Sequence, residues 1–193
     1  MAYRRRLSLP IVASLATLAC TAPAALAGGF ALSSPDVGPK APIANKHVFK
    51  GFGCEGENVS PALAWSGAPK DTKSFALMVY DPDAPTGSGW WHWVMFNIPA
   101  DAKDLPQGAG DPAAGKAPKG AVQGRTDFGK PGWGGPCPPV GHGPHRYVFT
   151  LHALKADKLD LPEDATAALV GYMVNANSIG KASFTAKYER RKQ

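Results

Sequence analysis

Glycine and proline interrupt this chain of 193 residues at nearly every segment, with 22 glycines and 19 prolines in all. Both residues are unfavourable inside helices and central strands and are favoured in turns. Apolar residues with a long helical period are accordingly rare, and short apolar runs bounded by turn residues are common. The sequence therefore predicts a mainly β protein with short strands and many loops.

Three apolar runs have the length and composition of buried β-strands. They cover residues 74–80, 91–98 and 145–155, and weaker candidates are 48–49, 63–65 and 184–188. In the third run, alternate residues from His145 to Ala153 share one face because side chains in a strand alternate with a period of two. These runs predict a central sheet with a buried face.

One helix is expected, near the carboxyl end. Pro162 precedes an acidic turn, and apolar residues then recur at helical spacing, so the pattern predicts a helix over about 163–176 whose apolar face carries Leu169, Tyr172, Met173 and Ala176. Residues 101–143 are rich in Gly, Pro and Lys instead, and a loop of this length is usually functional or mobile. We expect one domain in which the helix packs on the sheet.

The first 27 residues have the features of a secretory signal peptide. A basic start is followed by a short apolar stretch and by small residues at Ala25 and Ala27, which are typical of a cleavage site. The apolar stretch is too short to span a membrane. Lipid attachment at Cys20 and export by a twin-arginine route remain open. Residues 28–193 are predicted to form a single periplasmic or secreted domain without stable membrane insertion.

Charge and cysteine content agree with export. Without residues 1–27 the chain has 18 basic and 15 acidic residues, and because the basic residues are scattered we expect no nucleic-acid partner. Cys54 and Cys137 then remain as an even pair. In an oxidising compartment a disulfide between them is the natural interpretation, and two separate buried thiols are the alternative.

Two carboxylates directly follow the first predicted strand. In Asp81-Pro82-Asp83-Ala84-Pro85 the prolines forbid a helix and keep the residues before them extended, so both aspartates are held at one end of the sheet. The alternative is ordinary turn chemistry, in which an aspartate accepts local backbone N–H groups.

Imidazole and phenol groups are expected at the same end of the sheet. His92 begins the second strand and is expected to be half-buried, on the face that carries Val94; a core histidine without a binding role is the alternative. His145 and Tyr147 share one face of the third strand, whereas Arg146 points away and is expected to pair with a carboxylate.

The loop over residues 132–141 combines rigid prolines with a few N–H groups. Gly134, Gly135 and Cys137 have an N–H, and the prolines between and after them do not. Several free N–H groups held in a rigid frame can bind an anion, whereas a stiff connector is the simpler interpretation.

In combination these motifs resemble the signature regions of the phosphatidylethanolamine-binding protein family. The matching stretches are residues 81–85, Trp91 and His92 with Asn97, and residues 138–147. Residues 58–65 and 134–139 resemble its bacterial branch, which is often labelled Raf-kinase-inhibitor-like. The resemblance runs from about Phe30 to Arg190.

The resemblance implies a Greek-key β fold, with a large central sheet, a smaller second sheet and a small anion-binding cavity. It implies that the ligand is bound by Asp81, Asp83, His92, Pro138, Pro139, His145 and Tyr147, with Trp90 at the mouth. The N–H groups of the loop add Gly135 and Cys137 to these candidates.

The sequence therefore favours an exported protein that binds a small phosphate-like anion, with no metal and no cofactor. Catalysis is not expected, because no nucleophile is placed beside the carboxylates and histidines. One alternative is an inhibitor of a protease or kinase that acts through surface loops such as 101–143. A metal-dependent hydrolase using His92, His142 and His145 is a more remote alternative.

Overall fold

The computed structural model describes residues 1, 29–162 and 164–192, so the predicted signal peptide, apart from Met1, lies outside the described residues. The strands are β1 (Ala31–Ser33), β2 (Lys50–Gly51), β3 (Cys54–Glu55), β4 (Leu63–Ser66), β5 (Ser74–Asp81), β6 (Trp90–Pro99), β7 (Asp104–Leu105), β8 (Val122–Gln123), β9 (His145–Leu154) and β10 (Ser178–Tyr188). The helices are α1 (Ala167–Asn177) and two short 3₁₀ turns, Asn45–His47 and Pro112–Ala114.

The largest sheet has five strands in the order β10-β9-β5-β6-β8, and a second sheet has the order β1-β4-β7. Strands β2 and β3 form a separate short pair. All pairings within the large sheet are antiparallel. The predicted mainly β fold, with a large central sheet, a smaller second sheet and a C-terminal helix, is confirmed.

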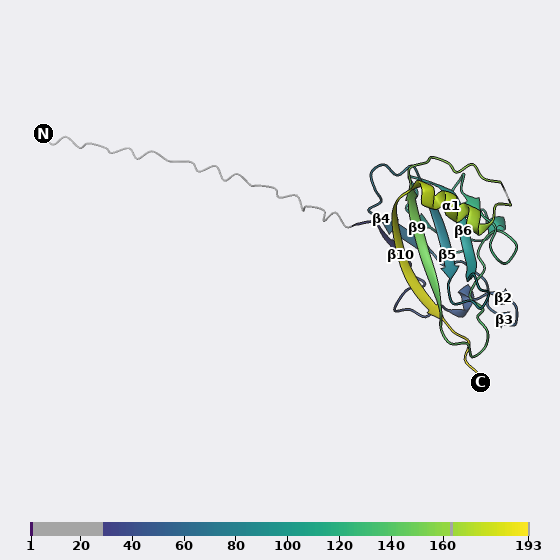
Figure 1. Cartoon of the computed structure of the whole chain (residues 1–193). Helices are drawn as coiled ribbons and strands as arrows, with labels where there is room; N and C mark the ends of the chain where they lie inside the picture. The colour runs from purple at the N-terminus through teal and green to yellow at the C-terminus, as the bar shows by residue number, and fades with distance from the viewer. Residues whose placement is uncertain (2–28, 163, 193) are drawn as a thin grey trace.

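The large sheet has a hydrophobic core on each face. One core joins Phe75, Trp93 and Phe149 to the small sheet through Leu63 and Trp65. On the other face α1 lies across the strands, as Figure 1 shows, and covers a second core. Burial of apolar surface on both faces explains why β5 and β6 are apolar almost throughout. No helix in the described part of the chain is long and apolar enough to cross a bilayer.

Helix α1 begins later than predicted and buries a different face. Thr166 caps its start by accepting a hydrogen bond from the backbone N–H of Leu169. Val170 and Val174 are buried, whereas Leu169 and Tyr172 are 41% and 71% exposed, so the predicted apolar face is wrong except at Met173, which packs against the second core. Small and β-branched side chains let the helix approach a sheet face whose own residues, such as Met78, already fill the space.

A β-bulge in β6 decides where His92 points. Val79 pairs with Trp93, but the next residue of β5 pairs with Trp91, so β6 has one extra residue at position 92. The alternation of side chains shifts there, and His92 lies on the face of Tyr147, opposite to Val94. The prediction that it shares a face with Val94 and is half-buried is therefore wrong, and only 3% of the residue is exposed.

A second bulge in β6 depends on Asn97. Its backbone has φ of +56°, and its side-chain amide donates to the carbonyl of Leu159 while its Oδ1 accepts the Leu159 N–H. Asparagine tolerates this left-handed conformation better than most residues.

We expect Asn97→Ala to lower the free energy of unfolding by about 2 kcal/mol, because both hydrogen bonds are lost and the backbone becomes strained. Asn97→Gly loses the same bonds without the strain and should cost less than Asn97→Ala. Urea unfolding at neutral pH measures both values, and equal costs would exclude the contribution of backbone strain.

Candidate functional site

A pocket of about 170 Å³ opens at the end of the large sheet where β5 ends and where β6 and β9 begin. Asp81 pairs with Trp90, and Tyr80 pairs with both Trp91 and Val148, so three distant segments meet at this edge. The pocket is lined by Phe52, Asp81, Ala84, Pro85, Thr86, Trp90, His92, Phe128, Cys137, Pro138, Pro139, His145 and Tyr147. Eight of the ten residues predicted to bind ligand are in this lining, and Asp83 and Gly135 are not.

Asp81 and His145 form a buried pair in the pocket wall. The Nδ1–H of His145 donates to Oδ2 of Asp81 at 2.7 Å, and their side chains are 2% and 4% exposed. The other carboxylate oxygen accepts the backbone N–H of Asp83. On the opposite side of the ring, Nε2 of His145 lies 2.7 Å from Nδ1 of the exposed His142. A hydrogen-bonded chain therefore leads from the buried carboxylate to the surface.

His92 is held in one tautomer by the loop that crosses it. Its Nδ1 lies 2.6 Å from the carbonyl oxygen of Gly134, and since a carbonyl only accepts, this nitrogen carries the proton. The N–H of Gly134 in turn donates to the carbonyl of His92. Burial lowers the pKa of His92 to about 4, so the ring is neutral at pH 7 and its Nε2 has a lone pair.

Tyr147 carries a hydroxyl group without a partner. The residue is fully buried, and its hydroxyl has no hydrogen bond to any described residue. Its ring lies edge-on to His92 with centroids 5.0 Å apart, and both residues line the pocket. Burial, together with the nearby Asp81, raises the pKa of the phenol, so the group remains a hydrogen-bond donor at any ordinary pH.

Asp83 and Gly135 have structural partners outside the pocket. Asp83 accepts from the guanidinium and from the backbone N–H of Arg146, which lowers the pKa of its carboxyl to about 2 and confirms that Arg146 pairs with a carboxylate. The N–H of Gly135 donates to Oδ1 of Asn58.

The expectation that the loop offers free N–H groups to an anion is therefore wrong for both glycines at its centre. The Gly134 N–H donates to His92 and the Gly135 N–H to Asn58. A side chain at Gly135 would place its Cβ 2.1 Å from the His47 carbonyl oxygen, so the residue must be glycine for packing.

Aromatic rings that the sequence did not single out form the mouth of the pocket. Phe128 stacks on Phe49 at 4.4 Å between centroids and contacts Phe52, Trp90 and His92 at 5.4 to 6.0 Å. Packing of this kind brings together residues that are 36 to 79 positions apart. The sequence signal for this cluster was weak, because Phe52 and Phe128 each stand beside glycine in a turn.

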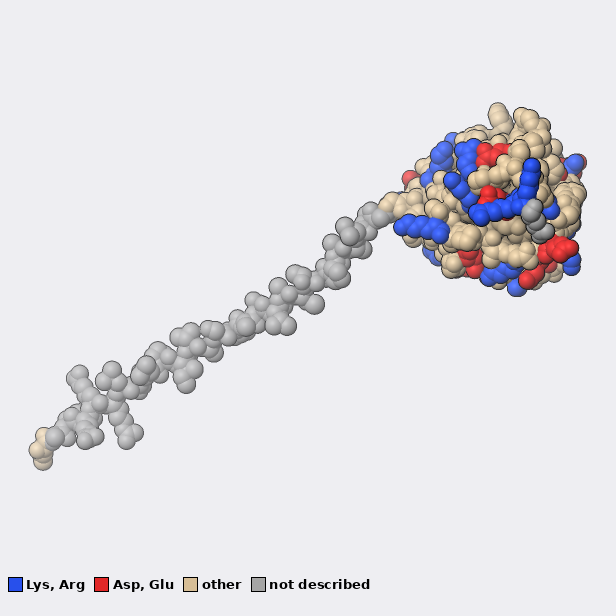
Figure 2. Space-filling model, turned by 90° about the horizontal axis from the view of Figure 1, so that it is seen from below, with Lys and Arg blue, Asp and Glu red and all other residues tan. Residues whose placement is uncertain are grey.

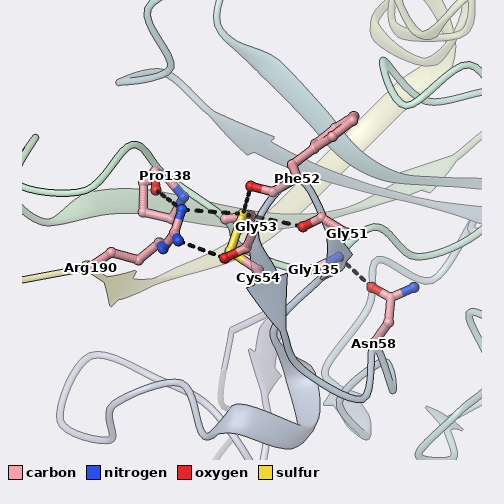
Figure 3. The surroundings of a disulfide bond; sticks show 9 residues. Gly51, Phe52, Gly53, Cys54, Asn58, Gly135, Pro138 and Arg190 are labelled. Carbon is pink, nitrogen blue, oxygen red and sulfur yellow. Dashed lines mark hydrogen bonds between the residues drawn. A yellow bond between two sulfur atoms is a disulfide. The ribbon is translucent and has the colours of Figure 1, made fainter.

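The disulfide between Cys54 and Cys137 is confirmed, and it joins the turn after β2 to the proline-rich wall of the pocket (Figure 3). Two buried independent thiols are thereby excluded. Among the described residues no group of three or more His, Cys, Asp or Glu could hold a metal ion. On the face seen in Figure 2, basic and acidic side chains are interspersed.

Comparisons with known proteins agree with the fold and with the family resemblance. A family model described as phosphatidylethanolamine-binding protein matches residues 33–189. The UPF0098 protein YbcL of Escherichia coli strain K12 is 54% identical over 165 residues, which cover 86% of this chain and 90% of the relative. Its crystal structure, described as a new member of the mammalian PEBP family, matches with a TM-score of 0.82 over 84% of this chain and 99% of that chain.

A relative from Mycobacterium tuberculosis, LppC, carries the word lipoprotein in its name. It is 34% identical over 180 residues, which cover 93% of this chain and 82% of the relative. The word lipoprotein is part of the name of the mycobacterial protein and describes that protein.

Proposed function

Because the chain belongs to the phosphatidylethanolamine-binding protein family, we propose that its pocket captures a small phosphate-bearing anion, either free phosphate or a phospholipid head group. The observation that carries this proposal is the Tyr147 hydroxyl, which is buried in the pocket wall without a partner among the residues that the structure describes. A buried donor left unpaired costs about 1–3 kcal/mol, and a ligand oxygen would remove that cost.

His92 supplies the second contact to the ligand, and this contact requires one bound proton. Nδ1 is occupied by Gly134, so Nε2 is the ring nitrogen available to a ligand. A neutral Nε2 accepts a hydrogen bond from a protonated phosphate oxygen, and a protonated Nε2 donates to an ionised one. In both cases the complex holds one proton more than the free protein and the fully ionised ligand. The negative charge of the Asp81 carboxylate also favours a proton on His92.

The first test is a titration of the purified protein with inorganic phosphate and with phosphoethanolamine, followed by NMR. We expect both ligands to move the signals of His92, His145 and Tyr147. A head-group site is indicated if phosphoethanolamine binds more tightly, and a phosphate site if the two are equal. Unmoved signals at millimolar ligand would exclude the proposal.

Phosphate affinity should rise as the pH falls from 7 towards 5. The pKa of His92 is about 4 in the free protein, and a bound anion raises it because opposite charge favours the imidazolium. Uptake of one proton strengthens binding by up to about tenfold per pH unit between the free and bound pKa values. Calorimetry at several pH values measures the slope. In His92→Gln we expect only the slope that the ligand's own titration causes.

Tyr147→Phe should change stability and binding in opposite directions. It removes only the hydroxyl, so the free energy of unfolding should rise by about 1–3 kcal/mol while phosphate affinity falls about 10- to 100-fold. Urea unfolding and calorimetry on the same samples measure the two effects. Val79→Ala, a change at a fully buried position of the same core, is the matched control and should lower stability with little effect on affinity. Loss of stability in Tyr147→Phe would show that the hydroxyl has a structural partner.

We propose in addition that the protein is exported. The support is the signal-like sequence at residues 1–27, the Cys54–Cys137 disulfide and the mycobacterial relative named as a lipoprotein. Cell fractionation of a bacterial host that makes the full chain tests this, and a full-length protein confined to the cytoplasm would contradict it. Inhibition of a protease or kinase stays a prediction that the pocket geometry does not address.

A further inference from the structure

Both the exposure and the backbone conformation of Phe52 are unfavourable for a phenylalanine. It is 73% exposed, and its backbone φ is +52°, in the left-handed region that a bulky side chain rarely adopts. That conformation brings Cβ close to the following carbonyl oxygen and is unfavourable for a residue other than glycine. Neither burial nor backbone preference therefore explains this position, and the residue lines the pocket. An outlier of this kind at a pocket mouth points to a role in recognition.

Three contacts hold the Phe52 turn against the pocket wall formed by residues 137–139. The Cys54–Cys137 disulfide lies two residues after Phe52. The guanidinium of Arg190 donates to the carbonyl of Gly53 at 2.6 Å and to that of Pro138 at 3.4 Å, and so it bridges the turn and the wall (Figure 3). On the other side of the turn, the Phe49 N–H donates to the carbonyl of Pro136.

These contacts matter because the turn has little stability of its own. Strands β2 and β3 contribute only two residues each, and an isolated hairpin even of normal length is marginal in water. From the last residue of β2 to the residue before β3, the backbone of Gly51, Phe52 and Gly53 has positive φ. The disulfide and Arg190 therefore supply restraints that the short strands lack, in addition to the ring contacts of Phe52 with Phe49 and Phe128.

We propose that the disulfide and Arg190 form a clasp that positions Phe52 over the pocket, and that this clasp makes recognition of the ligand's apolar substituent dependent on the oxidised state. The inference rests on the proposed function, since it concerns the same pocket. Phe52 and Phe128 are 6.0 Å apart between centroids, so the mouth offers aromatic surface to the part of a ligand that extends beyond its phosphate. Phe52 and Arg190 are positioning and specificity residues in this arrangement.

The redox step is an ordinary thiol–disulfide exchange. A dithiol such as dithiothreitol attacks one sulfur of the disulfide as a thiolate and displaces the other cysteine. Its second thiolate then displaces the first cysteine, and the reagent leaves as a cyclic disulfide. Two electrons pass from the dithiol to Cys54 and Cys137, which end as two thiols.

The experiment compares inorganic phosphate with phenyl phosphate, because only the second carries a ring that can reach the mouth. Affinities are measured by calorimetry in the oxidised protein and after reduction by dithiothreitol, below the melting temperature of the reduced form. We expect reduction to weaken phenyl phosphate about tenfold and inorganic phosphate less than twofold. The ratio of the two affinities is a quantity that a general loss of stability would not move.

Two variants test the clasp without reduction. Phe52→Ala should weaken phenyl phosphate as much as reduction does, and reduction should then have no further effect. Arg190→Ala should give part of the same loss, whereas Arg191→Ala is the matched control, because Arg191 is exposed and pairs only with Glu189 among its described contacts. The serine double variant at Cys54 and Cys137 should behave like the reduced protein if it folds.

The outcomes separate the clasp from the proposed function. If neither phosphate binds in any state, the proposed function is wrong and the clasp falls with it. If both bind, and the affinity ratio is the same in the oxidised, reduced and Phe52→Ala proteins, the clasp is wrong while the proposed function stands. These comparisons need only the wild-type protein and Phe52→Ala, so they do not depend on the folding of the cysteine variant.

Discussion

Acidification from pH 7 to pH 4 should remove several kcal/mol from the free energy of unfolding, before most carboxylates titrate. Two histidines cause most of this loss, and burial lowers the pKa of a third, His47, as well. Burial lowers the pKa of His92 to about 4, and burial with the nearby Lys181 lowers that of His152 to about 4, against 6.5 in an unfolded chain. The unfolded state therefore binds more protons between these values, so stability is complete above pH 6.5 and falls as the pH drops towards 4. His92 and His152 each contribute about 3 kcal/mol to the loss.

Urea unfolding at pH 7, 6, 5 and 4 measures this slope. His92→Gln and His152→Gln should each remove a large part of it, whatever they do to stability at pH 7, and the slope left in the double variant should be the smaller contribution of His47, whose pKa burial also lowers. Asp83 cannot produce the same slope, because its pKa is already lowered to about 2 and its contribution is lost only below about pH 4. An unchanged slope in the double variant would show that other groups cause the acid sensitivity.

Asp81→Ala should destabilise the protein by about 3–5 kcal/mol, because it removes one partner of a buried pair. The His145 Nδ1–H and the Asp83 N–H would both lose their acceptor. Asp81→Asn should cost less than Asp81→Ala, because the oxygen of the asparagine amide can still accept the Asp83 N–H. The amide nitrogen of the asparagine, however, cannot accept a hydrogen bond from Nδ1–H of His145. The histidine would then have to change tautomer, which ¹⁵N chemical shifts of its ring can detect.

The matched control is Asp83→Ala, two residues along the same turn. Its ion pair with Arg146 is partly exposed, with side-chain exposures of 54% for the arginine and 29% for the aspartate, and exposed pairs contribute about 0–1 kcal/mol. Urea unfolding of the three variants at pH 7 gives the comparison. A cost for Asp81→Ala no larger than that for Asp83→Ala would contradict the buried-pair interpretation.

The strands were predictable because their signal is local. The apolar runs at 74–80, 91–98 and 145–155 became β5, β6 and β9 within about one residue at each end. Turn residues beside each run mark where the strands stop, and antiparallel pairing then brings Asp81, His92 and His145 to one edge. Local chemistry was therefore sufficient to nominate most of the pocket lining.

Side-chain direction was less predictable, because it depends on how elements meet. The extra residue in β6 at His92 is visible only in the register against β5, and one residue of shift moves a side chain to the other face. The buried face of α1 was predicted from large apolar residues, whereas the sheet beneath it accepts Val170 and Val174. Hydrogen-bond partners were equally hard to predict, because they also depend on distant segments. The acceptor for the Gly135 N–H, for example, is Asn58, 77 residues away.

The sequence by itself determined the strand segments, the C-terminal helix, the cysteine pair and the polar groups that face the pocket, because composition and periodicity act over a few residues. Tertiary structure alone decided which of those groups remain without a partner. Tyr147 keeps an unpaired hydroxyl, while Asp83 and Gly135 are satisfied by Arg146 and Asn58. The physical reason is that a polar group's partner is set by packing between distant segments, and a sequence pattern does not contain those distances.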